Sequence, residues 1–150
     1  MSMEHIRKAT VWDAHRIAEM IVFNYRLNFY PIFRDDAFYF AELQVANIAG
    51  HYTDEAVLER TFVYDDGTVK GVLVISGNEI EKLFVEPVLH GQGIGARLLD
   101  FVVKHHGASY LWALEKNEKA ICFYQRHGFR LTGERKLEED TTEYLVRMER

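Results

Sequence analysis

The sequence has only one cysteine, two prolines and no long apolar run. Because Cys122 has no second thiol to pair with, the chain can form no internal disulfide, as is common in a reducing compartment. The longest apolar runs, such as residues 72–75, are far shorter than the ~20 residues that a membrane-spanning helix needs. The first residues also have no apolar core of a signal peptide. We therefore expect a cytoplasmic protein without membrane contact.

The sequence also has no excess of positively charged residues. The 18 lysines and arginines are outnumbered by 23 aspartates and glutamates, so the formal net charge is −5. Nucleic-acid-binding domains usually have a basic face, so we expect no nucleic-acid partner, and the acidic balance favours cationic partners. The seven histidines form neither an H-x-x-x-H nor an H-E-x-x-H pattern, and we therefore expect no metal site.

Hydrophobic residues make up 48% of the chain, and their spacing is regular. This amount suffices for one compact core, so we expect a single domain over residues 1–150. Thr10 and Asp13 form a helix-start signal, and the apolar residues that follow recur with helical spacing. The expected N-terminal elements are a strand at 5–9, a helix after Thr10, and a second helix from 35 or 36 to about 47.

From residue 61 onward the spacing changes from helical to alternating. Three segments rich in β-branched residues are separated by turn sequences, which predicts an antiparallel meander. Helical and strand patterns then alternate to the end of the chain. The expected elements are strands at 61–64, 69–76 and 79–85, a helix at 93–106, a strand at 109–114, a helix at 118–127, and strands at 129–134 and 143–148. The order β-α-α-β-β-β-α-β-α-β-β predicts one mixed α/β domain.

A glycine-rich turn joins the third strand of the meander to the next helix. Gly91, Gly93 and Gly95 leave backbone N–H groups uncovered at the positive end of the helix dipole, where phosphate oxygens bind well. The glycines could instead serve only a tight turn. Gly91, Gly93 and Ala96 also fit the dinucleotide pattern G-x-G-x-x-G/A, with Glu115 roughly 20 residues on. A meander precedes the turn and little chain follows it, which argues against a nucleotide-binding fold.

Two motifs, in the right order, resemble those of the GNAT superfamily of N-acetyltransferases. Residues 90–95 resemble the family's acetyl-CoA pyrophosphate loop, Q/R-x-x-G-x-G/A, with His90 where Gln or Arg is usual. Residues 117–129 are similar to the signature N-x-x-A-x-x-F-Y-x-x-x-G-F. The resemblance implies a splayed, mainly antiparallel mixed sheet flanked by about four helices. The sheet would open between the strands at 79–85 and 109–114.

The resemblance also implies which residues hold acetyl-CoA. The strand before the loop would meet the pantetheine arm, the loop would hold the pyrophosphate, and the second motif would line the cofactor. The strand residues are Leu83, Phe84 and Val85. The loop residues are His90, Gly91, Gln92, Gly93, Ile94, Gly95 and Ala96. The residues of the second motif are Asn117, Ala120, Phe123 and Tyr124. The implied reaction is direct acetyl transfer to a primary amine in a ternary complex. Homodimers are common in the family, and the sequence leaves the oligomeric state open.

Three residues are candidates for catalysis. Tyr124 would lie beside the thioester sulfur and protonate the departing thiolate, although its ring could instead serve only to pack the core. Glu79 lies eleven residues before His90, where the histone-acetylating branch of the family has its glutamate base, and Glu81 is the neighbouring alternative. Strand alternation would place both glutamates on the same face as Leu83.

The acceptor site is expected near an aromatic segment, with Phe29, Tyr30 and Pro31 as its contacts. Cys122 lies within a predicted helix and has no evident His–Asp partners, so we expect a buried, unreactive thiol. The main alternative function is a non-catalytic acyl-CoA-binding module that kept the loop but lost turnover. A nucleotide-binding protein is the less favoured alternative.

Overall fold

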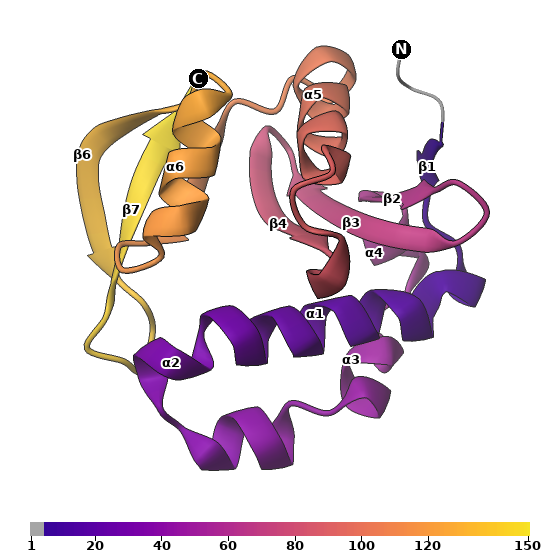
Figure 1. Ribbon diagram of the computed structural model, residues 1–150, viewed down its shortest axis with the longest axis horizontal. Coiled ribbons are helices and arrows are strands. Elements are labelled where there is room, and N and C mark those ends of the chain that lie inside the picture. The colour runs from indigo at the N-terminus through magenta and orange to yellow at the C-terminus, as the bar shows by residue number, and fades with distance from the viewer. Residues whose placement is uncertain (1–4) are drawn as a thin grey trace.

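The computed structural model describes residues 5–150, which fold around a seven-stranded sheet (Figure 1). The strands are β1 (Ile6–Lys8), β2 (Thr61–Asp65), β3 (Val69–Ser76), β4 (Glu79–Val85), β5 (Tyr110–Leu114), β6 (Arg130–Leu137) and β7 (Tyr144–Glu149). They lie in the order β1-β2-β3-β4-β5-β7-β6. β4 and β5 are parallel, and the other neighbouring strands are antiparallel. The predicted fold class is confirmed.

Six α-helices flank the sheet within residues 5–150, two more than expected. They are α1 (Ala14–Asn28), α2 (Tyr30–Phe33), α3 (Val45–His51), α4 (Glu55–Leu58), α5 (Ile94–His106) and α6 (Glu118–Arg126). Short 3-10 turns at Val11–Asp13 and Pro87–Leu89 and a π-helical segment at Ala37–Glu42 complete the helical structure. In this part of the chain no helix is both long and apolar enough to cross a membrane.

The second predicted helix is interrupted. Its first part is the π-helical segment Ala37–Glu42, and α3 begins only at Val45. Between them Leu43 leaves helical geometry (φ −80°, ψ 87°), and its side chain is buried in the core. Packing of this apolar side chain outweighs the local preference for a continuous helix.

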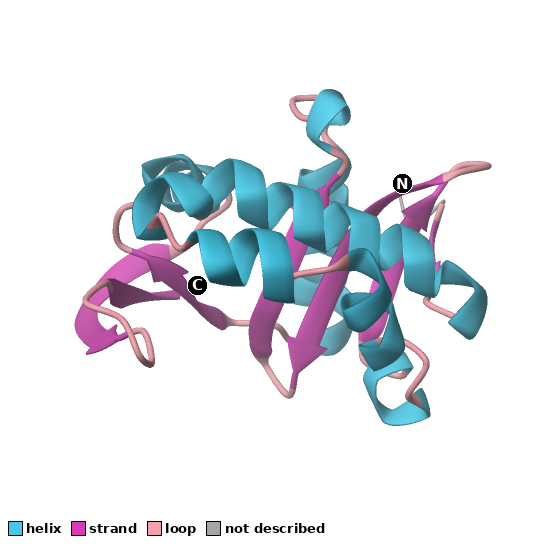
Figure 2. Ribbon diagram, turned by 90° about the horizontal axis from the view of Figure 1, so that it is seen from below, coloured by secondary structure: helices cyan, strands magenta, loops and turns pink. Residues whose placement is uncertain are grey.

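Two apolar cores lie on opposite faces of the sheet. On one face, Leu73 and Met148 pack with Leu98 of α5 and with side chains of α6. On the other face, Val72 packs with Ile17 of α1 and with residues of α3. In Figure 1, α5 and α6 lie in front of the two halves of the sheet, and Figure 2 shows α1 crossing the strands. Helices therefore pack on both faces of the sheet.

β4 and β5 pair over only two residue pairs, Glu79 with Tyr110 and Ile80 with Leu111. Beyond these pairs the strands separate, and the sheet divides into a β1–β4 half and a β5–β7–β6 half (Figure 1). The splay lies between the two strands where the family resemblance implied it. Because backbone polar groups need partners, the separated edges can accept a ligand.

A β-bulge at Glu81 changes which residues of β4 share a face. The pairing of β4 with β3 shifts at this point and leaves Glu81 as the extra residue. As a result, Leu83 packs on the same face as Ile80, in the core beneath α5 and α6. The prediction that Glu79 and Glu81 share a face with Leu83 is therefore wrong, because simple alternation does not continue across a bulge.

An ion-pair network joins β1 to the start of α1 and to β2. Arg7 donates to Asp13 (2.8 Å) and to Asp65 (2.9 Å), and the Thr10 N–H donates to Asp13 (2.8 Å). Thr10 and Asp13 form the capping box that the sequence predicts. Burial by itself would raise the pKa of Asp13, but the hydrogen bonds from Arg7 and Thr10 lower it below its ordinary value.

Replacing Asp13 with Asn should lower the free energy of unfolding at pH 7 by about 1–2 kcal/mol, because Arg7 and Thr10 lose a charged acceptor. The pKa of Asp13 is depressed in the folded state, so its stabilising effect is present above the unfolded pKa of about 3.9 and is lost below it. Urea denaturation should show the difference between Asp13→Asn and wild type shrinking as the pH falls toward 3.

The matched control is Asp100→Asn, since Asp100 pairs with Lys104 on the exposed surface of α5 (3.2 Å). This variant should change the unfolding free energy by less than about 0.5 kcal/mol at either pH. Equal losses for the two variants would contradict a specific role for the Arg7 network.

Candidate active site

The glycine turn leads into α5 with backbone geometry that only glycine adopts easily. Gly91 and Gly93 both have φ of 84°, and Gly93 is the residue at which α5 begins. A Cβ atom at either glycine would meet nothing within 4 Å, so the space in front of the turn is open. The first helical hydrogen bond runs from the Arg97 N–H to the Gly93 carbonyl, which leaves the preceding N–H groups available for an anion.

A cavity of about 450 Å³ lies in front of this turn, between β4 and α6. Among its described lining residues there is no aspartate or glutamate, whereas several side chains can carry positive charge: His90, Lys119, Arg126 and His127. The predicted cofactor residues that line it are Leu83, Phe84, Val85, His90, Gly91, Gly93, Ile94, Gly95, Ala96, Asn117, Ala120, Phe123 and Tyr124. The side chain of Gln92, also predicted, is exposed outside the lining. The charge and shape suit a polyanionic ligand.

The edge of β4 that borders this cavity has outward-facing backbone groups. The Glu86 N–H donates to the Lys70 carbonyl on β3 (2.9 Å). Hydrogen-bonded and non-hydrogen-bonded pairs alternate along an antiparallel ladder, so the backbone groups of Leu83 and Val85 point away from β3. Since β5 pairs with β4 only at its first two residues, these groups face the opening. An extended ligand can therefore bind here as an added strand would.

Two side chains satisfy the outward carbonyl of Val85. Asn24 of α1 is 1% exposed and donates through Nδ2 to Val85 O (2.9 Å) and to Met20 O (2.7 Å). His90 Nε2 also lies 2.9 Å from Val85 O, and it must donate because a carbonyl only accepts. This contact holds the glycine turn against β4 while the His90 ring lines the cavity.

α6 forms the opposite wall. Asn117 precedes this helix, and its Oδ1 accepts from the Ala120 N–H (3.3 Å), which leaves the side-chain NH₂ as a donor toward the cavity. Phe123 contributes a ring close to Gly95, where a Cβ atom would lie 3.6 Å from it. The residues of the second motif thus form both the helix cap and the cavity wall.

Tyr124 lies where α6 meets the splay. Its side chain is 8% exposed and packs edge to face against Phe123 (5.2 Å between ring centroids) and Phe129 (5.7 Å). Burial raises its pKa well above the ordinary value for tyrosine, so the hydroxyl stays protonated at neutral pH. Within residues 5–150 this hydroxyl makes no hydrogen bond, which leaves its proton available to a ligand.

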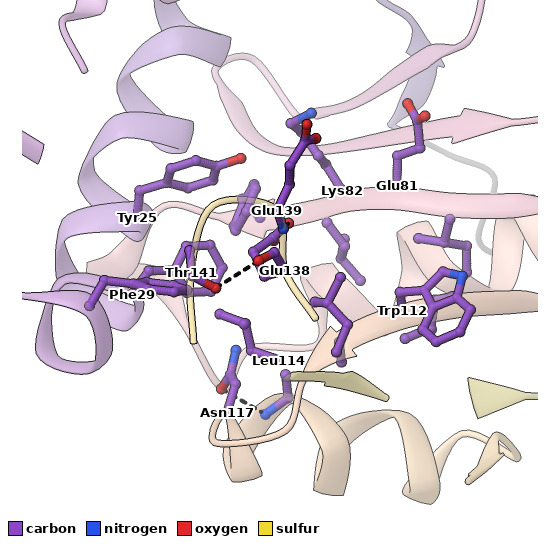
Figure 3. Close-up of a pocket in the computed structure, with 18 of the residues that line it drawn as sticks. Tyr25, Phe29, Glu81, Lys82, Trp112, Leu114, Asn117, Glu138, Glu139 and Thr141 are labelled. Carbon is purple, nitrogen blue, oxygen red and sulfur yellow. Dashed lines mark hydrogen bonds between the residues drawn. The ribbon is translucent and has the colours of Figure 1, made fainter. Parts of the chain in front are cut away.

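A second cavity, of about 520 Å³, opens on the side of α1 and the β6–β7 connection (Figure 3). Rings and carboxylates dominate its walls. The rings are Tyr25, Phe29, Phe33, Phe38, Tyr39, Phe84, Trp112 and Tyr124, and the carboxylates are Asp35, Glu81, Glu138, Glu139 and Asp140. Among the described residues that line this cavity, Lys82 is the only lysine or arginine. Its charge therefore suits a cationic ligand.

The two cavities meet in the splay of the sheet. Both are lined by Leu83, Phe84, Asn117, Ala120 and Tyr124. A group that extends from an anionic ligand in the first cavity can therefore meet a group that enters through the second. Tyr124, whose hydroxyl stays protonated, lines both cavities, as a general acid would have to.

The two predicted glutamates lie in different surroundings. Glu79 borders neither cavity and is paired opposite Ser76 and Tyr110 at the start of β4. Glu81 lines the acidic cavity, but its carboxylate accepts from Arg60 (2.5 Å). Of the two predicted glutamates, the structure thus brings only Glu81 to the site, and its carboxylate is already paired with Arg60.

Of the three predicted acceptor-site residues, only one lines the acidic cavity. Phe29 lines the acidic cavity, whereas Tyr30 donates to Asp36 (2.6 Å) and, like the exposed Pro31, lies outside the lining. Cys122 is exposed on the outer side of α6, so the prediction of a buried thiol is wrong. On this short helix the apolar face is formed by its neighbours, and position 122 points away from the sheet.

Several site residues were not predicted from the sequence. Asn24 and Tyr25 lie within an ordinary amphipathic helix pattern, and nothing local marks them as part of a site. Glu138, Glu139 and Asp140 form an acidic run between two strands, a signal that is visible in the sequence but is usual for a solvated turn.

Comparisons with known proteins agree with this geometry. Residues 57–131 match a family model described as an acetyltransferase (GNAT) domain. The sequence is 29% identical over 101 residues to the peptidyl-lysine N-acetyltransferase YjaB of Salmonella typhimurium. The aligned region covers 67% of this chain and 68% of that protein. It is 32% identical over 104 residues to the uncharacterized N-acetyltransferase Mb2688 of Mycobacterium bovis, which covers 63% and 67%, respectively.

The fold is shared as well. The PaiA N-acetyltransferase of Thermoplasma acidophilum, solved in complex with coenzyme A, superposes with a TM-score of 0.66 at 17% identity, over 97% of this chain and 98% of that one. The family match spans half of the sequence and includes β4, the glycine turn and α6. The chain therefore belongs to the GNAT family of acetyltransferases.

Proposed function

We propose that this protein transfers the acetyl group of acetyl-CoA to the side-chain amine of a lysine in a peptide or protein. The observation that carries the proposal is the meeting of two cavities of opposite charge at the Tyr124 hydroxyl. One suits an anionic acyl donor and the other a cationic acceptor. We assign the reaction to the cytoplasm, where the exposed thiol of Cys122 would stay reduced.

Acetyl-CoA suits the first cavity in charge and in hydrogen-bonding pattern. The N–H groups at the start of α5 would bind pyrophosphate oxygens, in the space that Gly91 and Gly93 leave open. The outward groups of Leu83 and Val85 would hydrogen-bond the pantetheine arm along β4. Lys119 and Arg126, on α6, add positive charge to the same cavity. The relative that was solved with coenzyme A supports this assignment.

The residues at the junction suit acyl transfer from a thioester. Bound acetyl-CoA supplies an activated acyl group. The Val85 N–H, which faces the opening, can donate to the carbonyl oxygen as negative charge develops on it. The Tyr124 hydroxyl, kept protonated by its burial, can donate a proton to the departing sulfur. No covalent intermediate with the protein is needed, because both substrates can reach the junction together.

A lysine side chain is the acceptor that the second cavity favours. Its carboxylates attract an ammonium group, and its aromatic wall can pack against an aliphatic chain. YjaB of Salmonella typhimurium, a relative over two thirds of this chain, is a peptidyl-lysine N-acetyltransferase, which supports the same acceptor class. A non-catalytic acyl-CoA-binding module would have no evident use for a second cavity that opens onto the Tyr124 hydroxyl.

The direct test is to incubate the purified protein with acetyl-CoA and matched peptides that differ in their amines. We expect acetylation of a peptide whose only free amine is a lysine side chain, measured by mass spectrometry and by release of free thiol. A peptide with a blocked N-terminus and arginine in place of lysine is the control and should stay unmodified. Binding of acetyl-CoA without transfer to any peptide would favour the non-catalytic module.

Replacing Gly93 with Glu should weaken acetyl-CoA binding by at least about 100-fold, because a side chain and a negative charge would occupy the anion site. Calorimetric titration measures this loss. Gly107→Glu is the matched control, since Gly107 ends the same helix with a similar positive φ (66°). This control shares the backbone strain and the added charge but should bind acetyl-CoA as wild type does. Equal weakening in both variants would contradict the assigned site.

Tyr124→Phe should lower kcat by about 100- to 1,000-fold while leaving the affinity for acetyl-CoA within about threefold of wild type, because only the proton donor is removed. The folded state should stay intact, since the hydroxyl has no hydrogen-bond partner in residues 5–150 to lose. Tyr144→Phe, on the exposed surface of β7, is the control and should retain full activity. Unchanged turnover in Tyr124→Phe would exclude this hydroxyl as the acid.

A further inference from the structure

Glu138 lies at the end of β6, where the chain turns toward β7 and borders the acidic cavity. Figure 3 shows it together with Glu139 and Thr141, next to Tyr25 and Phe29 of α1. It is half-buried, whereas the following two residues, Glu139 and Asp140, are exposed. All three acidic residues of this turn line the cavity, and Glu138 is the one that is partly shielded from solvent.

The turn is fixed by its own hydrogen bonds. The Glu138 N–H donates to the Glu143 carbonyl (2.8 Å), and the Glu138 carbonyl accepts from the Thr141 hydroxyl (2.8 Å) and N–H (3.1 Å). The Glu139 N–H donates to one oxygen of the Glu138 carboxylate (3.1 Å). The position of this carboxylate is therefore set by backbone contacts and does not depend on a salt bridge.

The Glu138 carboxylate has no cationic partner among residues 5–150, unlike other glutamates nearby. Glu81, the other candidate in this cavity, is paired with Arg60 (2.5 Å). Glu143, at the far end of the same turn, is paired with Lys116 (3.1 Å). A carboxylate that remains unpaired in a half-buried site is the one best able to bind an incoming cation.

Tyr25 shows how close this charge lies to α1. Burial, together with the negative charge of Glu138, raises the pKa of Tyr25 to about 12. The same charge adds to the effect of burial on Tyr39, which lies on the π-helical segment. The Tyr25 hydroxyl has no hydrogen-bond partner in the described part of the chain, so its proton can serve a ligand or a bound water.

We infer that Glu138 receives the ammonium group of the acceptor and acts as the base that removes its proton. This inference rests on the proposed function. It assigns the role of base to Glu138, whereas the sequence predicted Glu79 or Glu81. Glu138 lines the same cavity as Tyr124, so a substrate that fills this cavity can contact both residues. The other titratable groups that border this cavity are Tyr25, Tyr39, Asp35, Glu81, Lys82, Glu139 and Asp140.

The protons balance as follows in the proposed reaction. Glu138 takes one proton from the ammonium group, directly or through a water, and the neutral amine forms a bond to the thioester carbonyl carbon. The carbon–sulfur bond breaks with its electron pair on sulfur, which takes the Tyr124 proton. The second proton lost by the nitrogen returns to the tyrosinate, and Glu138 releases its own proton to solvent. The products are the acetylated lysine, coenzyme A and one proton.

The test compares Glu138→Gln with Glu134→Gln, two variants that each remove one negative charge. Glu134 is exposed on β6 and lines neither cavity. Gln at position 138 can still accept the Glu139 N–H, so the turn should keep its structure. We expect kcat/KM for a lysine peptide to fall by about 100-fold or more in Glu138→Gln, and by less than about threefold in Glu134→Gln. Acetyl-CoA affinity should stay unchanged in both, because neither residue lines the first cavity.

The pH profile separates a base from a general electrostatic effect. Wild-type kcat/KM should level off well below the pKa of a free lysine amine, about 10.4, whereas in Glu138→Gln it should keep rising toward that value. Equal losses in the two variants, or a wild-type pH profile in Glu138→Gln, would overturn the assignment of the base. Wild-type protein that binds acetyl-CoA but acetylates no lysine peptide would instead refute the proposed function itself.

Discussion

The separation of β4 from β5 after two residue pairs is the constraint on which the rest of the structure depends. With continued pairing, the outward groups of Leu83 and Val85 would bond to β5, and no space would remain between α5 and α6. A buried polar group left without a partner costs about 1–3 kcal/mol, so a splayed sheet must satisfy or use its free edges. Here Asn24 and His90 satisfy the Val85 carbonyl, and the N–H groups beside it remain for a ligand.

The splay also separates charge. The start of α5 and the basic side chains of α6 face one side of the opening, and the turn between β6 and β7 brings its carboxylates to the other. Two substrates of opposite charge can then approach from opposite sides without competing for one entrance. The net charge of −5 does not reveal this arrangement, because it is a sum over surfaces of opposite charge.

Much of the fold could be predicted because its signals are local. The bounds of β3 and β4 match the predicted strands, and the glycine turn and the Asn117–Tyr124 motif line the first cavity where the family resemblance implied. What failed depends on tertiary contacts. The bulge at Glu81 shifts the alternation of β4 without any mark in the sequence. Glu138 and Tyr25, more than a hundred residues apart in the sequence, come to line one cavity only after the chain has folded, and no local pattern encodes this.

Several features around the opening of the sheet break local rules. Gly91 and Gly93 have positive φ beside the first cavity, the edge of β4 beyond Ile80 is not paired with β5, and the buried Tyr124 hydroxyl has no partner within residues 5–150. Each would be unfavourable in a protein selected for stability alone, and the two cores on either face of the sheet must offset their cost. The Tyr124 hydroxyl is the clearest case, because phenylalanine would fill the same space without burying an unsatisfied donor. A buried hydroxyl that packing alone does not require is what the proposed role of Tyr124 as proton donor needs.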